Sequence, residues 1–263
     1  MDIKTIIKKK NNFVIGMVHC LPLPGTWKFD DNCEYIVQRA IEDAITLEKA
    51  GCDAIMIENM CDDPLSIKLD TAQAVALSAI TARIREKVSL PIGIDAAFCD
   101  YEVAISIAKF NNCQFVRLPV FVDRVQFFGG VIDPCARESI LYRKNLNAQD
   151  IMILADIQVK HTNLITPTPI EASAKNAVAC GADAVIVTGS TTGEATPLEM
   201  IERVQKVVNV PVIVGSGANK DNINSQFEIA DGAIIGSSFK ESGVLTNPIV
   251  FEKVEQLMKN IRK

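Results

Sequence analysis

The chain has 263 residues, of which 48% are hydrophobic and 22% charged, and its formal net charge is −5. This balance is typical of a soluble globular protein that can bury a large core. The mild acidity, without a basic aromatic-rich patch, argues against a nucleic-acid partner. No stretch is long and apolar enough to span a membrane, and residues 1–12 lack the apolar region of a secretory signal.

Eight cysteines are scattered along the chain, with no CxxC pair and no zinc-ligand spacing. Cys52, Cys113 and Cys180 adjoin apolar runs, so we expect them to pack as small hydrophobic side chains. Scattered cysteines in a chain of this length indicate a reducing compartment, and we expect the protein to be cytoplasmic.

The first half of the chain alternates predicted strands and helices. Residues 2–10 are predicted to form a short helix that caps the bottom of the fold. Apolar residues at helical spacing predict a helix over residues 32–51, which Gly51 would end. The other elements of this half are predicted strands at 13–18, 53–57, 91–94 and 114–118, and predicted helices at 71–88 and 101–111.

The second half begins with a long segment, residues 119–133, that we predict to be irregular. It contains Phe127, Phe128, Gly129 and Gly130, a composition that suits a lid over the strand ends. After it come a predicted helix at 134–146 and predicted strands at 151–155, 184–187, 210–214 and 232–235.

The two halves also repeat each other. Residues 51–59 (GCDAIMIEN) reappear as 181–189 (GADAVIVTG), and residues 87–93 (KVSLPIG) reappear as 206–213 (KVVNVPVI). The strands are short apolar runs, as expected for a parallel sheet covered on both faces. Together these features predict one closed (β/α)₈ TIM barrel over residues 1–263 as a single domain.

Polar and ionisable residues gather at the ends of the predicted strands. The carboxyl ends of parallel barrel strands meet at one mouth, where TIM-barrel enzymes place their chemistry. A lone histidine there is usually a structural residue, but the convergence of many such groups predicts an active or binding site. The candidates are His19, Glu58, Asn59, Asp95, Arg117, Asp156, Lys160 and His161, with Thr188 and Gly189 at the tip of the sixth strand.

Two loops of small residues follow the last two predicted strands. Their backbone N–H groups can closely approach an anion, and barrels often bind a phosphate group there. Residues 219–222 are predicted to open a short helix whose dipole favours an anion, and Lys240 would add positive charge. The predicted phosphate-binding residues are Gly215, Ser216, Gly217, Gly236, Ser237 and Ser238.

These motifs resemble the BtpA/SgcQ family of (β/α)₈ barrels nearly from end to end. The resemblance lies in residues 15–19 (IGMVH) with 21–25 (LPLPG), 53–59 (DAIMIEN) with Asp62 and Pro64, 115–117 (FVR), 155–156 (AD) through 159–161 (VKH), 188–189 (TG) with 192–193 (TG), 215–217 (GSG) with Asn222, and Gly236 with 239–240 (FK). The chain departs from the family where Asp95 and Cys99 replace the usual asparagines, and residues 127–130 look individual.

What the resemblance implies about activity is limited. The family is similar to ribulose-phosphate-binding barrels in its phosphate loops. Some members are linked with photosystem I biogenesis, and others look like components of sugar-utilisation gene sets. A carboxylate in place of an amide at residue 95 adds charge at the mouth, which predicts a substrate preference different from that of relatives.

The leading hypothesis is an enzyme that acts on a small phosphorylated sugar or similar anionic metabolite. Glu58 or Asp156 would serve as general base, and Lys160 or His161 as general acid or electrophile. Isomerisation or epimerisation, aldol cleavage through a Schiff base on Lys160, and hydrolysis all stay open. The alternative is a non-catalytic assembly factor that uses the barrel as a binding scaffold.

A divalent metal ion is a further hypothesis, and no other cofactor is predicted. Its ligands would be His19, Glu58, Asp156 and His161. The HxH pair of many metallohydrolase barrels is missing, because Cys20 and Leu21 follow His19. Barrels of this size often pair through exposed helix faces, but no residue pattern decides whether this chain forms a homo-oligomer.

Overall fold

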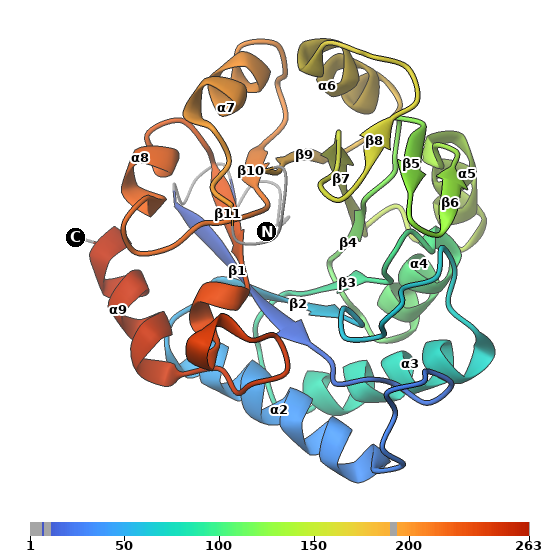
Figure 1. Ribbon diagram of the computed structural model, residues 1–263, viewed down its shortest axis with the longest axis vertical. Helices are drawn as coiled ribbons and strands as arrows, with labels where there is room; N and C mark the ends of the chain where they lie inside the picture. Colours follow the sequence, from blue (N-terminus) through green and yellow to red (C-terminus); the bar gives the residue numbers. More distant parts are fainter. Residues whose placement is uncertain (1–6, 8–11, 190–193, 263) are drawn as a thin grey trace.

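The computed structural model describes residue 7 and residues 12–189 and 194–262. Eight parallel strands form a closed barrel, which confirms the predicted TIM-barrel fold, and Figure 1 shows the ring of strands inside a ring of helices. In order around the ring the strands are β1 (Phe13–His19), β2 (Ala54–Glu58), β3 (Ile92–Asp95), β4 (Phe115–Leu118), β7 (Met152–Ile157), β9 (Ala184–Val187), β10 (Val212–Val214) and β11 (Gly232–Ile235).

The helices pack around this barrel, and three of them begin at a residue whose side chain accepts a hydrogen bond from a free N–H group of the first turn. Asn32 accepts a hydrogen bond from the N–H of Tyr35, and Asp70 forms a capping box with Gln73. The helices are α2 (Cys33–Lys49), α3 (Thr71–Arg85), α4 (Tyr101–Phe110), α5 (Ala136–Asn145), α6 (Ile170–Ala179), α7 (Leu198–Gln205), α8 (Ile223–Phe227) and α9 (Phe251–Ile261). Among the described residues no helix is long and apolar enough to cross a membrane.

Alternate side chains of the strands fill the inside of the barrel. Met17, Met56, Phe115 and Leu154 belong to one buried inner cluster, which also contains Ile7. Since side chains alternate along a strand, the residues two positions further on point into the same space at the mouth. Those residues are His19, Glu58, Arg117 and Asp156, and Asp95 follows Gly93 in the same way.

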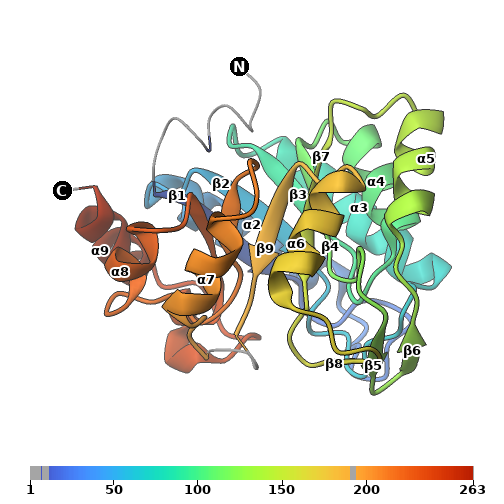
Figure 2. The same cartoon turned by 90° about the horizontal axis from the view of Figure 1, so that it is seen from above.

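The segment over residues 119–133 is more regular than the sequence predicts. It contains a hairpin of β5 (Val125–Phe127) and β6 (Gly130–Ile132), and β5 also pairs with β8 (Asn163–Leu164). Figure 2 shows this small sheet at one end of the barrel. The prediction of an irregular segment is therefore wrong, because strands of three residues are too short to give a readable periodicity.

Two further expectations have different outcomes. Cys52 and Cys113 are buried as expected, but Cys180 is exposed because it follows the last residue of α6 at the outer end of that helix. The expected helix over residues 2–10 falls outside the described residues except for Ile7, and so do Thr192 and Gly193.

Candidate functional site

A cavity opens at the carboxyl ends of the barrel strands. This position is typical of a small-molecule site in a TIM barrel. It brings together predicted acid/base residues and both predicted phosphate loops, from opposite halves of the chain. The predicted residues that line it are His19, Glu58, Asp95, Arg117, Lys160, His161, Gly215, Ser216, Gly217, Gly236 and Ser237, together with Ser238.

His19, Glu58 and Asp95 lie in one row across three neighbouring strands. The register pairs His19 of β1 with Glu58 of β2, and Glu58 with Asp95 of β3. His19 Nε2 lies 3.4 Å from Glu58 Oε2. Burial, with the positive charges of Lys240, Lys160 and Arg117 nearby, lowers the pKa of His19 to about 3, so its imidazole is neutral.

Glu58 and Asp95 form a buried pair of carboxyl groups. Burial raises the pKa of both, and the negative charge of Glu58 raises the pKa of Asp95 further. Among the described residues neither oxygen of Asp95 has a well-formed hydrogen-bond partner, and Asp95 is only 1% exposed. Two such groups side by side titrate as a unit and retain a proton between them at pH values where isolated carboxyls are ionised. The pair can therefore both accept and donate a proton.

Arg117 organises the carboxylates of this site. Its Nε and Nη2 donate to the two oxygens of Asp156 at 2.8 and 2.9 Å, and Nη1 lies 3.2 Å from Asp95 Oδ2. Although burial opposes its charge, Asp156 and Asp95 keep the pKa of Arg117 above its ordinary value. Because both oxygens of Asp156 are engaged and Asp156 does not line the cavity, Glu58 is the better placed base.

Lys160 follows β7 and lines the same cavity as the carboxyl pair. Its backbone N–H donates to Thr188 Oγ1 at 3.1 Å, so Thr188 positions this turn and does not line the cavity. Burial lowers the pKa of Lys160, and the charge of Arg117 lowers it further. His161 also lines the cavity but is exposed, and burial and Lys160 lower its pKa.

The two loops predicted to bind phosphate are closely packed against neighbouring residues. Gly217 has φ 65°, and a Cβ there would lie 2.2 Å from the backbone of Glu194, so only glycine fits without a shift. A Cβ at Gly236 would lie 2.6 Å from His19 Cε1. The backbone of the second loop therefore lies directly against the ring of His19.

The helix expected to add a dipole to the phosphate site has a different role. α8 is five residues long, and residues 219–222 do not line the cavity. Instead, Asn222 Nδ2 donates to the carbonyl of Gly217 at 2.8 Å, and Asn222 Oδ1 accepts from the N–H of Asn219. These side chains hold the shape of the Gly217 turn.

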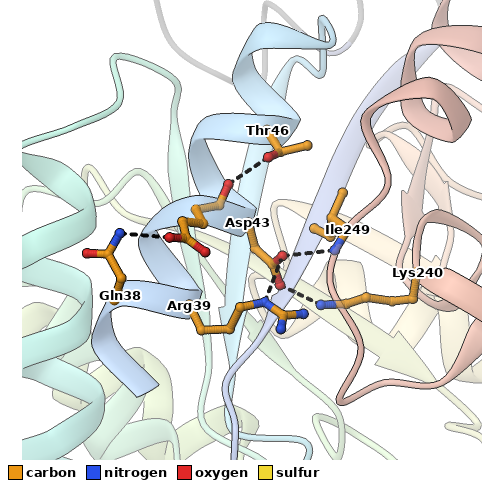
Figure 3. Close-up of polar contacts among 7 residues, drawn as sticks. Gln38, Arg39, Asp43, Thr46, Lys240 and Ile249 are labelled. Carbon is orange, nitrogen blue, oxygen red and sulfur yellow. Dashed lines mark hydrogen bonds and ion pairs between the residues drawn. The ribbon is translucent and has the colours of Figure 1, made fainter. Parts of the chain in front are cut away.

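Lys240 is turned away from the cavity, so its expected role at the phosphate site is wrong. Its Nζ lies 2.5 Å from Asp43 Oδ2 on α2, and the side chain is 1% exposed. Figure 3 shows Asp43 between Lys240, Arg39 and the backbone N–H of Ile249, which donates at 2.9 Å. This buried cluster attaches the segment after β11 to α2. It therefore fixes the position of the loop that begins at Gly236.

Two other predicted substrate-binding residues also have structural roles. Asn59 exchanges two hydrogen bonds with the backbone of Ala97 and donates to Asp62, which fixes the chain beyond β3. Gly189 lies against the backbone of Glu194 and does not line the cavity. The described residues contain no group of three or more His, Cys, Asp or Glu side chains arranged for a metal ion, so the structure does not bring the four candidate ligands together.

Phe98 is a cavity residue that the sequence reasoning missed. It lines the cavity just beyond Asp95, and its ring stacks on Phe127 of the hairpin with a centroid distance of 4.2 Å. The hairpin therefore supports the wall of the cavity through this contact. The sequence feature that could have identified Phe98 is its position three residues after Asp95, the carboxylate at the end of β3. Other apolar lining residues are Met17, Met60, Ala97, Pro119, Val159, Ala218, Ile234, Ile235 and Leu245.

The neutral state of His19 predicts a pH dependence of stability. Its folded pKa of about 3 lies below the ordinary 6.5, so the unfolded chain binds a proton first. The contribution of His19 to the free energy of unfolding is fully present above pH 6.5 and is lost as the pH falls from 6.5 towards 3. Between pH 6.5 and 3, replacing His19 with Gln should reduce the slope of the free energy of unfolding against pH by up to about 1.4 kcal/mol per pH unit, as measured by urea denaturation. His161→Gln is the matched control, and equal slopes for wild type and His19→Gln would contradict the assignment.

The sequence pattern of the BtpA family matches residues 10–263. This chain belongs to the BtpA family. An uncharacterised protein of Pyrococcus furiosus is 38% identical over 94% of this chain and 93% of that relative. The photosystem I biogenesis protein BtpA of Synechocystis is 33% identical over 91% of this chain and 84% of the relative. An uncharacterised mitochondrial protein of Caenorhabditis elegans is 32% identical over 98% of this chain and 96% of that relative.

Solved structures share the barrel of this BtpA-family chain at low sequence identity. Thiamine phosphate pyrophosphorylase of Pyrococcus furiosus aligns with a TM-score of 0.60 and 16% identity, covering 97% of this chain and 98% of the enzyme. N-(5'-phosphoribosyl)anthranilate isomerase of the same organism aligns with a TM-score of 0.57 and 12% identity, covering 95% and 98%. At this identity the likeness shows the fold alone.

Proposed function

We propose that this protein is an enzyme that acts on a small phosphorylated sugar or a similar anionic metabolite by acid/base chemistry. The observation that carries the proposal is the carboxyl pair of Glu58 and Asp95, buried in the cavity and facing the two glycine loops. Burying two neighbouring carboxyl groups is costly, and such groups gather where chemistry requires them.

Each part of the cavity has a role in this proposal. Backbone N–H groups of the loops at Gly215–Gly217 and Gly236–Ser238 hold the phosphate, and Glu58 removes a proton from the carbon next to a carbonyl. Asp95 shares the transferred proton, while Lys160 acts on the carbonyl group of the substrate. This arrangement favours isomerisation, epimerisation or aldol cleavage, because the carboxyl pair and the amine of Lys160 line the same cavity.

In this proposal the chain functions as one domain in a reducing compartment such as the cytoplasm. All eight cysteines are free, which fits that setting. A second candidate function, assembly of a larger complex, has support from the name of the Synechocystis relative. A binding scaffold has no need for buried ionisable groups in a cleft, so the enzyme explains more of the structure.

Ser237 offers a direct test of the phosphate site. It lines the cavity, is only half-buried, and lies beyond the tight contacts that would make a Gly217 variant misfold. We expect ribose 5-phosphate and inorganic phosphate to raise the melting temperature, with about 2.7 kcal/mol of stabilisation at a hundredfold excess over Kd. Ser237→Asp should abolish this shift through repulsion between like charges, and the uncharged Ser237→Asn, of the same size as the aspartate variant, should retain it. Equal shifts in both variants would place the phosphate elsewhere.

A further inference from the structure

Lys160, which is half-buried, differs from the buried Lys240. The amine of Lys240 is neutralised by Asp43, whereas no described carboxylate lies within ion-pair distance of the amine of Lys160. Arg117 already engages two of the nearest carboxylates, Asp95 and Asp156. Lys160 therefore lines the cavity without a described carboxylate that would hold its amine as a structural cation.

The backbone on both sides of Lys160 is held in a costly conformation. Gln158 and His161 both have positive φ angles, 51° and 63°, which non-glycine residues rarely adopt. Gln158 is fixed in place, since its N–H donates to Asp123 and its side chain donates to the carbonyl of Thr168 and to Ser173. Thr188 accepts from the N–H of Lys160 itself. Strain that the surroundings enforce in this way is characteristic of functional sites.

Groups that can move protons share the cavity with this lysine. Glu58 and Asp95 line the same cavity and together hold an exchangeable proton, and neutral His19 lies beside Glu58. Burial and Arg117 lower the pKa of Lys160, which increases its nucleophilic free-amine form. A nucleophile and a proton donor therefore share one largely buried space.

We propose that Lys160 attacks the carbonyl carbon of an open-chain aldose or ketose phosphate and holds it as an imine. The inference rests on the proposed function, because the phosphate loops must hold the other end of the substrate. The amine nitrogen forms a bond to the carbonyl carbon, and its proton passes to the oxygen. A proton from the Glu58–Asp95 pair then lets that oxygen leave as water, which gives the protonated imine. Glu58, now ionised, is ready to remove a proton from the substrate, as aldol cleavage or isomerisation requires.

Reduction with sodium borohydride tests this inference, since it converts an imine into a stable secondary amine. The protein is incubated with dihydroxyacetone phosphate or ribose 5-phosphate, reduced, and analysed by intact mass and peptide mapping. We expect one adduct on Lys160, reduced by competing inorganic phosphate and absent with unphosphorylated dihydroxyacetone. Lys160→Met should lose the adduct, and Lys206→Met, at an exposed lysine, should keep it.

The outcomes separate this inference from the function on which it rests. Stabilisation by a sugar phosphate without an adduct on wild-type Lys160 would overturn the imine and leave the phosphate site standing. Adducts spread over many lysines, and unchanged in Lys160→Met, would also overturn it. Absence of both stabilisation and adduct would overturn the proposed function as well. Peptide mapping of the wild-type protein decides the matter even where Lys160→Met folds poorly.

Discussion

Replacing Glu58 with Gln is expected to reduce turnover by roughly 10²–10⁴-fold while leaving binding of the phosphorylated ligand intact. The amide keeps the size of the side chain but cannot accept the proton from the substrate. The phosphate loops belong to the other half of the barrel, so their hold on the ligand should not change. Turnover is measured by proton NMR, as incorporation of solvent deuterium next to the substrate carbonyl.

Glu42→Gln is the matched control for this experiment, because Glu42 is an exposed carboxylate on α2. It should leave both turnover and binding unchanged. Activity of Glu58→Gln within a few-fold of the wild type would remove Glu58 from the role of base. A loss of ligand binding together with turnover would instead indicate that Glu58 shapes the site.

Replacing Arg117 with Met is expected to destabilise the fold by about 3–5 kcal/mol. Asp95 and Asp156 would remain buried, at 1% exposure each, without the cation that neutralises them. The free energy of unfolding is measured by urea denaturation, at neutral pH where the carboxylates are most costly. Adding Asp156→Leu to Arg117→Met should recover part of the loss, because one uncompensated charge is removed.

Arg203→Met gives a control with the same chemistry in a different setting. Arg203 also donates two hydrogen bonds to one carboxylate, that of Glu171, but this pair lies on the surface. Solvent screens such pairs, so its loss should change stability little. Equal destabilisation by the two arginine variants would contradict the view that burial makes Arg117 essential.

Much of the site could be predicted because it follows from strand alternation. Each strand carries inward side chains at every second residue. The residue two positions after the last inward apolar side chain therefore points into the mouth. His19, Glu58 and Asp95 follow this rule, and the parallel register places them side by side. The closed barrel itself follows from the count and spacing of short apolar strands.

The pairings within the mouth could not be predicted in the same way. Periodicity shows that Arg117 and Asp156 both point inward, but not that the gap between β4 and β7 suits a bidentate contact. Lys240 follows a 3₁₀ turn, η1 (Ser237–Phe239), whose geometry directs the side chain outward to Asp43 on α2. That contact joins residues 197 positions apart, which no local pattern reveals.

The most direct test of the central claim is proton NMR of the wild-type protein in D₂O with a panel of aldose and ketose phosphates. The account predicts that deuterium enters at the carbon next to the carbonyl of at least one compound. It also predicts that the exchange stops in Glu58→Gln and in Ser237→Asp, and continues in Ser237→Asn. Binding of these compounds at the phosphate loops without any exchange would contradict acid/base chemistry at this mouth. That result would favour a binding scaffold as the function of the protein.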